Sequence, residues 1–162
     1  MKERIEYIPM RERIVDSVEA SGLIKDGMTV AFGGYTSCGY PKMIVSQLAA
    51  RKKSGEDLHI SLFAGSAVGP IENTLGSVII RQMPMIESKT MRQLANKGQV
   101  HYVEQQMNKM LRLLRSGTLG EIDVAVVEAL GVTKEGYIIP TSSVGMVPHL
   151  LKRAKSIIVE IN

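Results

Sequence analysis

The stretch "VAFGGYTSCGYPKMIVSQLAARK", residues 30–52, places three glycines between two apolar runs. The run at 28–32 is short, apolar and partly β-branched, which predicts a buried strand. Pro41 stands where a helix would begin, and Ile44 and Leu48 then follow four residues apart on one helical face. The stretch therefore predicts a strand, a glycine-rich loop and a helix.

The same order of elements recurs along the chain. Apolar runs predict strands at 58–65, 77–85, 99–104, 122–130, 137–140 and 157–162. Helical spacing of apolar residues predicts helices at 9–24, 41–53, 87–98 and 105–120, with Met10, Ile14 and Val18 on one face of the first, and residues 142–156 predict a loop followed by a helix. This alternation predicts an α/β fold with a mainly parallel open sheet and flanking helices.

Length and composition are typical of an ordinary globular domain. The 162 residues are 44% apolar, which suits one domain over 1–162 with a substantial core. A net charge of +4 with 4% aromatic residues favours an anionic ligand over nucleic acid. The N-terminus lacks the apolar core of a signal peptide, and no apolar run reaches the length of a membrane span. We expect a soluble cytoplasmic protein that binds neither nucleic acid nor membranes.

Three segments that follow predicted strands are rich in Gly, Ser and Thr: 33–40, 65–70 and 141–145. Ligands of open α/β sheets bind beyond the carboxyl ends of the strands, so these segments mark the expected site. They do not match the dinucleotide fingerprint, the P-loop or the serine-hydrolase elbow. Backbone N–H groups and the hydroxyls of Thr36 and Ser37 suit a carboxylate, an acyl oxygen or a phosphate. A tight turn with a satisfied helix cap explains the first segment equally well.

Individual reactive residues are weaker indicators of function. Cys38 stands at an expected helix N-terminus, where a thiol can become nucleophilic, but no base can be paired with it, so a buried structural cysteine is favoured. The three histidines are scattered, and no metal site is expected. Glu128 ends a strand that should be buried and needs a partner or a path to solvent. A structural role for this carboxylate is favoured over a catalytic one.

Several segments together resemble a known family. They are "DGMTVAFGGYTSCGYPKMI", "AGSAVGP", "PMIESKTMRQLANKG", "IDVAVVEALGVTKEGYIIPTSSVG" and "KSIIVEIN". In this order they resemble the acetyl-CoA hydrolase/transferase family, which includes succinyl-CoA:acetate CoA-transferases. The likeness runs from about residue 14 to 162. It implies a fold like that of family I CoA-transferases, which are built from two similar α/β halves, and this chain matches the N-terminal half.

The resemblance also implies an activity. A glutamate in the second half attacks the acyl-CoA and forms a glutamyl-CoA thioester, so coenzyme A is a substrate and no cofactor is permanently bound. No residue here matches that glutamate, and we carry over no catalytic residue. The implied partners are the C-terminal half, an acyl-CoA, a small carboxylate and further copies of the chain in a homo-oligomer. The implied substrate-binding residues are Gly33, Gly34, Tyr35, Thr36, Ser37, Gly39, Gly65, Ser66, Gly69, Thr141, Ser142, Ser143 and Gly145.

Two departures from the family pattern keep other functions open. Residues 106–109 and Met146 replace polar residues that family members often carry near the site. These changes put acetate or succinate specificity in doubt and favour a larger or more apolar acyl group, or a non-catalytic partner protein of the same fold. A third alternative, a sugar-phosphate isomerase-like enzyme, rests on fold analogy.

Overall fold

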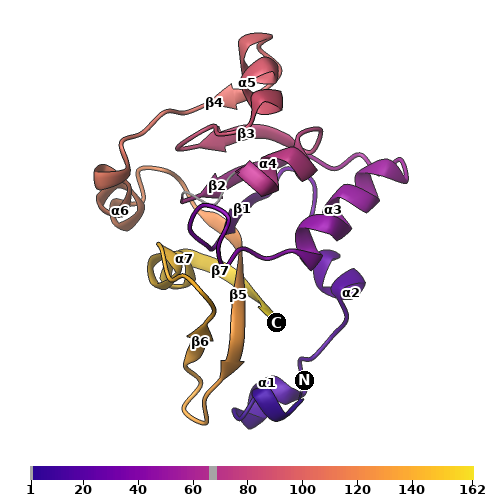
Figure 1. Ribbon diagram of the computed structural model, residues 1–162, viewed down its shortest axis with the longest axis vertical. Helices are drawn as coiled ribbons and strands as arrows, with labels where there is room; N and C mark the ends of the chain where they lie inside the picture. Colours follow the sequence, from indigo (N-terminus) through magenta and orange to yellow (C-terminus); the bar gives the residue numbers. More distant parts are fainter. Residues whose placement is uncertain (1, 66–68) are drawn as a thin grey trace.

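Seven strands form one sheet in the computed structural model, which describes residues 2–65 and 69–162 (Figure 1). The strands are β1 (Thr29–Phe32), β2 (Ile60–Ala64), β3 (Ile79–Met83), β4 (His101–Tyr102), β5 (Ile122–Val132), β6 (Ile138–Pro140) and β7 (Ala154–Ile161). The helices are η1 (Lys2–Arg4), α1 (Ile8–Arg11), α2 (Ser17–Ser21), α3 (Met43–Lys53), α4 (Gly69–Leu75), α5 (Lys89–Asn96), α6 (Met107–Ser116) and α7 (Val147–Arg153). The predicted mixed α/β class with a mainly parallel sheet is confirmed.

The order in which successive strands are added to the sheet reverses between β1 and β5. The order is β4-β3-β2-β1-β5-β6, with β7 also paired to β5; among the strand pairs of the described residues, β5–β6 is antiparallel and the others are parallel. The chain moves outward from β1 to β4 and then returns to the other side of β1. In open α/β sheets such a switch point is where the ligand crevice forms.

Both faces of the sheet are covered by helices because the buried strands alternate their side chains. Along β1, Val30 and Phe32 join the core cluster under α3 and α4, whereas Ala31 joins the cluster under α6 and α7. Figure 1 shows α3 and α4 on one side of the sheet, and α6 and α7 on the other. Within the two described ranges, none of the helices combines the length and apolar character that crossing a bilayer requires.

The predicted helix over 9–24 is wrong. The chain there forms two short helices, α1 and α2, and none of Met10, Ile14 and Val18 is buried; Val18 is 63% exposed. Asp16 interrupts the pattern, because its backbone is extended and its carboxylate accepts the N–H of Glu19 at 2.8 Å as the N-cap of α2. The other predicted helices and strands are present, with boundaries that differ by a few residues.

A fully buried carboxylate joins α4 to the start of α5. Glu72 accepts the backbone N–H of Glu87 at 3.0 Å, and it also accepts the N–H of Ser88 and the side-chain amide of Gln82. Ser88 is in turn the N-cap of α5. The donors that surround Glu72 are those that a buried carboxylate requires, so this residue has a structural role.

Candidate functional site

The first glycine-rich loop leaves β1 at the switch point and closes into a tight turn. Gly33 continues the strand pairing by donating its N–H to Val126 O at 2.9 Å. Tyr35 and Cys38 then exchange two backbone hydrogen bonds of 2.9 and 3.0 Å. Thr36, at the tip, has a φ of +52°, a conformation that β-branched residues rarely adopt. The tip projects from the sheet edge and is exposed.

Gly34 sits where any side chain would be both strained and crowded. Its φ is +116°, and a Cβ there would lie 3.0 Å from the carbonyl oxygens of Cys38 and Gly39 and from the Cα of Tyr40. The glycine thus allows the loop to fold back onto its own backbone. The tight turn that was predicted as an alternative for this segment is therefore present. The loop also contacts Gly65 and the loop at 141–145.

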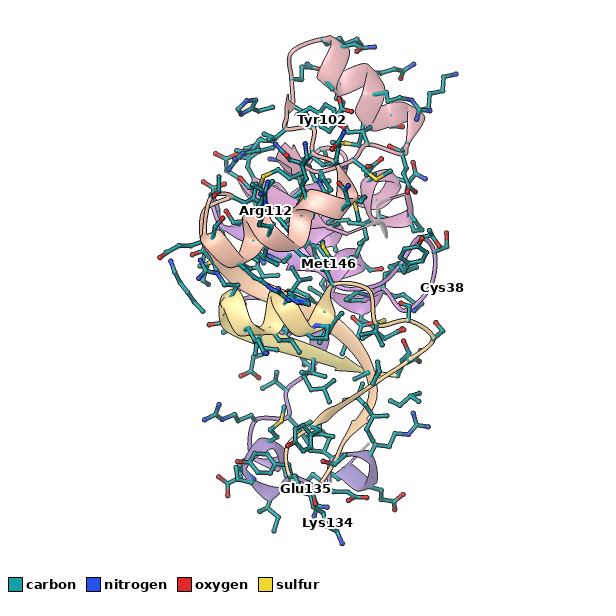
Figure 2. The ribbon with its side chains drawn as sticks, turned by 90° about the vertical axis from the view of Figure 1, so that its left-hand side faces the viewer. Cys38, Tyr102, Arg112, Lys134, Glu135 and Met146 are labelled. Atoms are coloured by element: carbon teal, nitrogen blue, oxygen red, sulfur yellow. The ribbon has the colours of Figure 1, made fainter. Side chains whose placement is uncertain are left out.

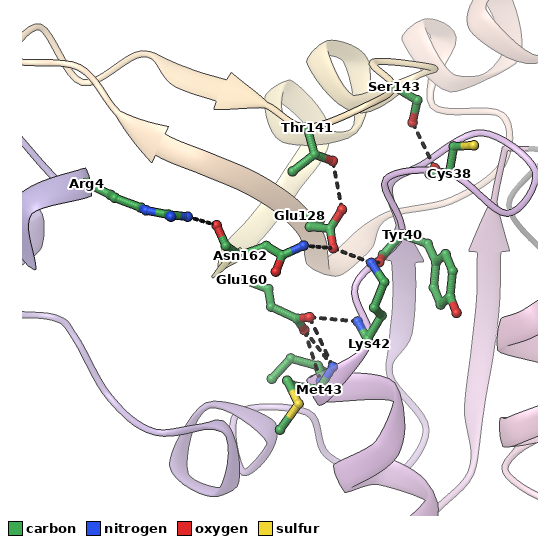
Figure 3. A network of polar contacts seen from close by, with 11 residues as sticks. Arg4, Cys38, Tyr40, Lys42, Met43, Glu128, Thr141, Ser143, Glu160 and Asn162 are labelled. Atoms are coloured by element: carbon green, nitrogen blue, oxygen red, sulfur yellow. Dashed lines mark hydrogen bonds and ion pairs between the residues drawn. The ribbon is translucent and has the colours of Figure 1, made fainter. Parts of the chain in front are cut away.

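The loop at 141–145 lies directly against the first loop. The position of a Cβ on Gly39 is 2.6 Å from Ser143 Oγ, and the position of a Cβ on Gly145 is 2.8 Å from Gly34 O. Ser143 donates its hydroxyl to Cys38 O at 2.9 Å (Figure 3). Two predicted segments that are about 100 residues apart in the chain thus form one continuous surface.

The second segment reaches the same place through Gly65. The position of a Cβ on Gly65 is 3.4 Å from Met146 Cε and 3.9 Å from Gly34 O. Met146 is 9% exposed and provides an apolar side chain where the three segments meet. Figure 2 shows Met146 at the centre of the molecule, beside the start of α7.

The loop at 141–145 reaches this edge by a route that the sequence analysis did not foresee. It follows β6, which is antiparallel, and not a parallel strand. Pro140, the last residue of β6, pairs with Ala129 of the long strand β5. Ala129 is only a few residues beyond Val126, which pairs with Phe32 at the carboxyl end of β1. The loop that follows Pro140 therefore begins close to the end of β1.

Other predicted site residues lie farther from this junction. Gly33 is buried under α7, where a Cβ would lie 2.7 Å from Val147 Cγ2. Gly69 lies beside the Glu87 carboxylate: the position of a Cβ on Gly69 is 3.3 Å from Glu87 Oε2. Exposed side chains at the rim are those of Tyr35, Thr36, Ser37 and Ser142. Ser66 lies outside the described residues.

Glu128 has the partner that its burial requires. Its side chain is 3% exposed and forms an ion pair with Lys42 Nζ, whose side chain is 49% exposed. The carboxylate also accepts the Thr141 hydroxyl at 2.7 Å and the Asn162 side-chain amide at 3.1 Å (Figure 3). Glu128 thus fixes the position of Thr141, at the start of the third loop, which agrees with a structural role.

A second carboxylate lies beside the first and holds the same lysine. Glu160 of β7 pairs in register with Glu128 of β5. It accepts the backbone N–H of Lys42 at 2.7 Å, of Met43 at 3.0 Å and of Ile44 at 3.1 Å, which are the first N–H groups of α3. The two glutamates therefore fix the point where the first loop becomes a helix.

The role of Lys42 was missed by the sequence analysis, although a signal was present. A cation at a helix N-terminus is disfavoured by the helix dipole, so a lysine directly after Pro41 requires a carboxylate from elsewhere in the chain. Lys42 Nζ also lies 4.8 Å from the centre of the Tyr40 ring and donates to Tyr40 O at 3.0 Å. These contacts hold the C-terminal end of the loop.

The expectation that Cys38 is buried is wrong. The thiol is exposed at the tip of the first loop (Figure 2), because the turn that Tyr35 closes directs residues 35–38 away from the core. Over the described ranges, no three His, Cys, Asp or Glu side chains gather as metal ligands would. The site consists of main chain, hydroxyl groups and one apolar side chain.

The chain is similar in sequence to two kinds of known protein. The chain is 30% identical over 165 residues to a succinyl-CoA:acetate CoA-transferase of Clostridium kluyveri, covering 99% of this chain and 31% of that protein. It is 30% identical over 174 residues to an acetyl-CoA hydrolase of Eremothecium gossypii, covering 100% and 33%. The chain spans about a third of the length of the curated relatives it matches.

Solved structures support the architecture. Glutaconate coenzyme A-transferase from Acidaminococcus fermentans superposes with a TM-score of 0.70 at 13% identity, over 91% of this chain and 67% of that one. At that identity the likeness shows the fold alone. The profile of the acetyl-CoA hydrolase/transferase N-terminal domain matches residues 1–162. The chain therefore belongs to the acetyl-CoA hydrolase/transferase family, of which it carries the N-terminal domain.

Proposed function

We propose that this chain is the N-terminal half of an enzyme that moves coenzyme A between an acyl-CoA and a small carboxylic acid. The observation that carries the proposal is the match of the whole chain to the family. The meeting of three loops at the switch point of the sheet supports it, because this is where α/β proteins bind small ligands. In this proposal the chain contributes one wall of a cleft, and the remainder of the protein contributes the other.

The proposed substrate-binding wall offers the acyl group two kinds of contact. Gly34 and Gly39 are buried and fold the first loop back on itself, which leaves the hydroxyls of Thr36 and Ser37 exposed to a carbonyl or carboxylate oxygen. Met146 provides an apolar contact for the acyl chain where the three segments meet. The position of Met146 favours an acyl group that is larger or more apolar than acetyl.

The proposed nucleophile belongs to the other half. A glutamate there attacks the acyl-CoA, a glutamyl-CoA thioester forms, and the donor acid leaves. CoA then passes to the acceptor carboxylate, or water hydrolyses the thioester and releases CoA. Glu128 and Glu160 are not candidates for this role, because both are occupied by Lys42 and by the start of α3. The chain alone should therefore be inactive.

An exchange assay tests this proposal. Labelled acetate is incubated with acetyl-CoA and the 162-residue chain, first alone and then with the C-terminal half of the same protein. We expect label to enter acetyl-CoA only when both halves are present. Turnover by the chain alone would contradict the proposed division of labour. The absence of turnover with both halves, for acetate with acetyl-CoA and for a longer carboxylic acid with its own CoA ester, would contradict the activity.

A further inference from the structure

A pocket between α6 and α7 lies away from the site described above. It has a volume of about 330 Å³ and is lined by Leu114, Arg115, His149, Lys152 and Arg153. α7 starts at Val147, beside Gly33, and ends at Arg153, immediately before β7 begins level with Ile122. The pocket is therefore at the amino ends of β5 and β7, the edge of the sheet opposite to the three loops. Figure 2 shows α6 and α7 side by side on the face turned to the viewer.

The packing of the two helices explains why their charges gather there. Met110 and Leu114 of α6 and Leu150 of α7 belong to one core cluster, which holds the helices together. Arg115 is in the last turn of α6, and Lys152 and Arg153 are in the last turn of α7. The apolar seam therefore places the basic ends of both helices around one opening.

These cations are not neutralised within the described part of the chain. The neighbouring carboxylates, Glu121 and Asp123, both pair with Lys155, and no carboxylate of residues 2–65 or 69–162 forms a salt bridge with Arg115, Lys152 or Arg153. Each helix C-terminus contributes a charge of only about −0.5. Three cations against two helix ends leave a net charge of about +2 at the pocket.

His149 supplies an independent observation. Arg115 Nη2 lies 2.8 Å from His149 Nε2, and because a guanidinium can only donate, the imidazole accepts there and carries its proton on Nδ1. That buried Nδ1 has no acceptor among the residues that the structure describes. Arg153 Nη2 lies 3.1 Å from the position of a Cβ on Gly117, so its guanidinium reaches back over the end of α6. Arg115 and Arg153 thus bring guanidinium donors to the pocket from both helices.

We propose that the pocket between α6 and α7 binds a phosphate-bearing anion. A phosphate dianion matches the net charge, and its oxygens accept hydrogen bonds from two guanidinium groups, the geometry that arginine recognises well. The inference does not rest on the proposed acyl transfer, because the pocket shares no lining residue with the three loops. The phosphate has two possible sources, a free phosphorylated compound or the phosphates of coenzyme A itself.

Titration calorimetry with pyrophosphate tests the proposal. We expect saturable binding at one site, and we expect Arg153→Gln to weaken it by about tenfold or more, because a charge-assisted bidentate contact is lost. Lys134→Gln is the matched control: it removes the same charge from the exposed β5–β6 turn at the far end of the molecule (Figure 2), and we expect less than about a twofold effect there. Thermal melts identify any variant that fails to fold, and Lys152→Gln then replaces Arg153→Gln.

Equal weakening by the Arg153 and Lys134 variants would overturn the proposal, since it would indicate attraction to net charge alone. The absence of saturable binding to the unmodified chain would overturn it as well. A second titration with coenzyme A identifies the source of the phosphate. Loss of CoA binding in Arg153→Gln assigns the pocket to the phosphates of CoA, whereas unchanged CoA binding alongside weakened pyrophosphate binding assigns it to a separate phosphorylated compound.

Discussion

Lys42 is held by two carboxylates, one of which binds its backbone and the other its side chain. Glu160 accepts its backbone N–H, whereas Glu128 pairs with its side chain. The pair with Glu128 is asymmetric, because the carboxylate is 3% exposed and the lysine side chain is 49% exposed. Removing one partner leaves either a buried anion or a half-solvated cation, and these have very different costs.

The asymmetry predicts unequal effects of two substitutions. Lys42→Met leaves Glu128 buried with Thr141 and Asn162 as its remaining donors, and we expect a loss of about 2 kcal/mol in the free energy of unfolding. Glu128→Gln leaves a lysine that water can solvate, and we expect about 1 kcal/mol or less. Urea denaturation at neutral pH measures both. Equal losses, or a larger loss in Glu128→Gln, would contradict the described geometry.

Gly34 and Gly55 provide a matched pair of glycine substitutions. Both have positive φ, +116° and +95°, but a Cβ on Gly34 would crowd three backbone atoms, whereas a Cβ on Gly55 meets nothing within 4 Å. We expect Gly34→Ala to cost at least about 1 kcal/mol more than Gly55→Ala in urea denaturation. In the assembled protein we also expect turnover to fall for Gly34→Ala only. Equal losses of stability would contradict the crowding around Gly34. Unchanged turnover would contradict the placement of this loop in the substrate-binding site.

At the scale of elements, β7 determines where α3 begins. Glu160 on β7 caps the first N–H groups of α3, so the strand and the helix are coupled through one side chain. We expect Glu160→Gln to lower the free energy of unfolding by about 1 kcal/mol, because the neutral amide loses the interaction with the helix dipole. Glu12→Gln, at an exposed glutamate, is the control. A loss in the control as large as that in Glu160→Gln would point to net charge as the cause.

Asp123 connects three strands at the other end of the sheet. The backbone N–H of Thr29 on β1 and the ammonium group of Lys155 on β7 lower the pKa of Asp123 below its ordinary value of 3.8. A lowered pKa means that the folded state binds the proton more weakly than the unfolded chain, so this contribution to stability is present above about pH 4 and is lost as the pH falls further. Asp123→Asn should therefore be less stable than the unmodified chain at pH 6.

Acid titrations of both proteins measure this difference, which we expect to shrink as the pH falls through the lowered pKa of Asp123. A difference that stays constant from pH 6 to pH 3 would show that the ionised carboxylate contributes nothing specific.

The sheet could be predicted from the sequence and the two N-terminal helices could not, for physical reasons. The strand at 122–130 is an apolar run that only a buried strand explains, and β5 is found there. Spacing at 9–24 predicted one helix, but periodicity does not reveal whether a surface exists to cover the apolar face, and Val18 is exposed. The direction of each strand could not be predicted either, because the apolar pattern of β6 does not reveal that β6 runs antiparallel to β5.

The candidate site shows the same division. The loops at 33–40 and 141–145 do lie together, but only the first leaves a parallel strand, because the second follows the antiparallel strand β6. The contact between Lys42 and Glu160 was missed because the two residues lie 118 positions apart in the chain, and only the folded sheet brings them together. The prediction that Cys38 is buried was wrong, because the geometry of the turn, and not the residue type, determines how exposed its side chain is.

For the molecule as a whole, the proposed site depends on the switch point between β1 and β5, where the order of the strands reverses. The first loop leaves β1 at that point, the third loop reaches it from β6, and Met146 lies between them. The chain spans about a third of the length of its curated relatives, and we propose that it supplies one wall of their cleft. On this account, the acyl end of the substrate contacts the loops and the α6–α7 pocket takes a phosphate on the opposite edge.

Hydrogen exchange in the assembled protein, with and without acetyl-CoA, tests the central claim most directly. The account predicts slower exchange of the backbone amides at 33–40 and 141–145 when the thioester is bound, because these loops close on the acyl group. It predicts no such change in α5, which lies at the far edge of the sheet beside β4 (Figure 1). Unchanged exchange in both loops, with protection elsewhere in residues 1–162, would contradict the account.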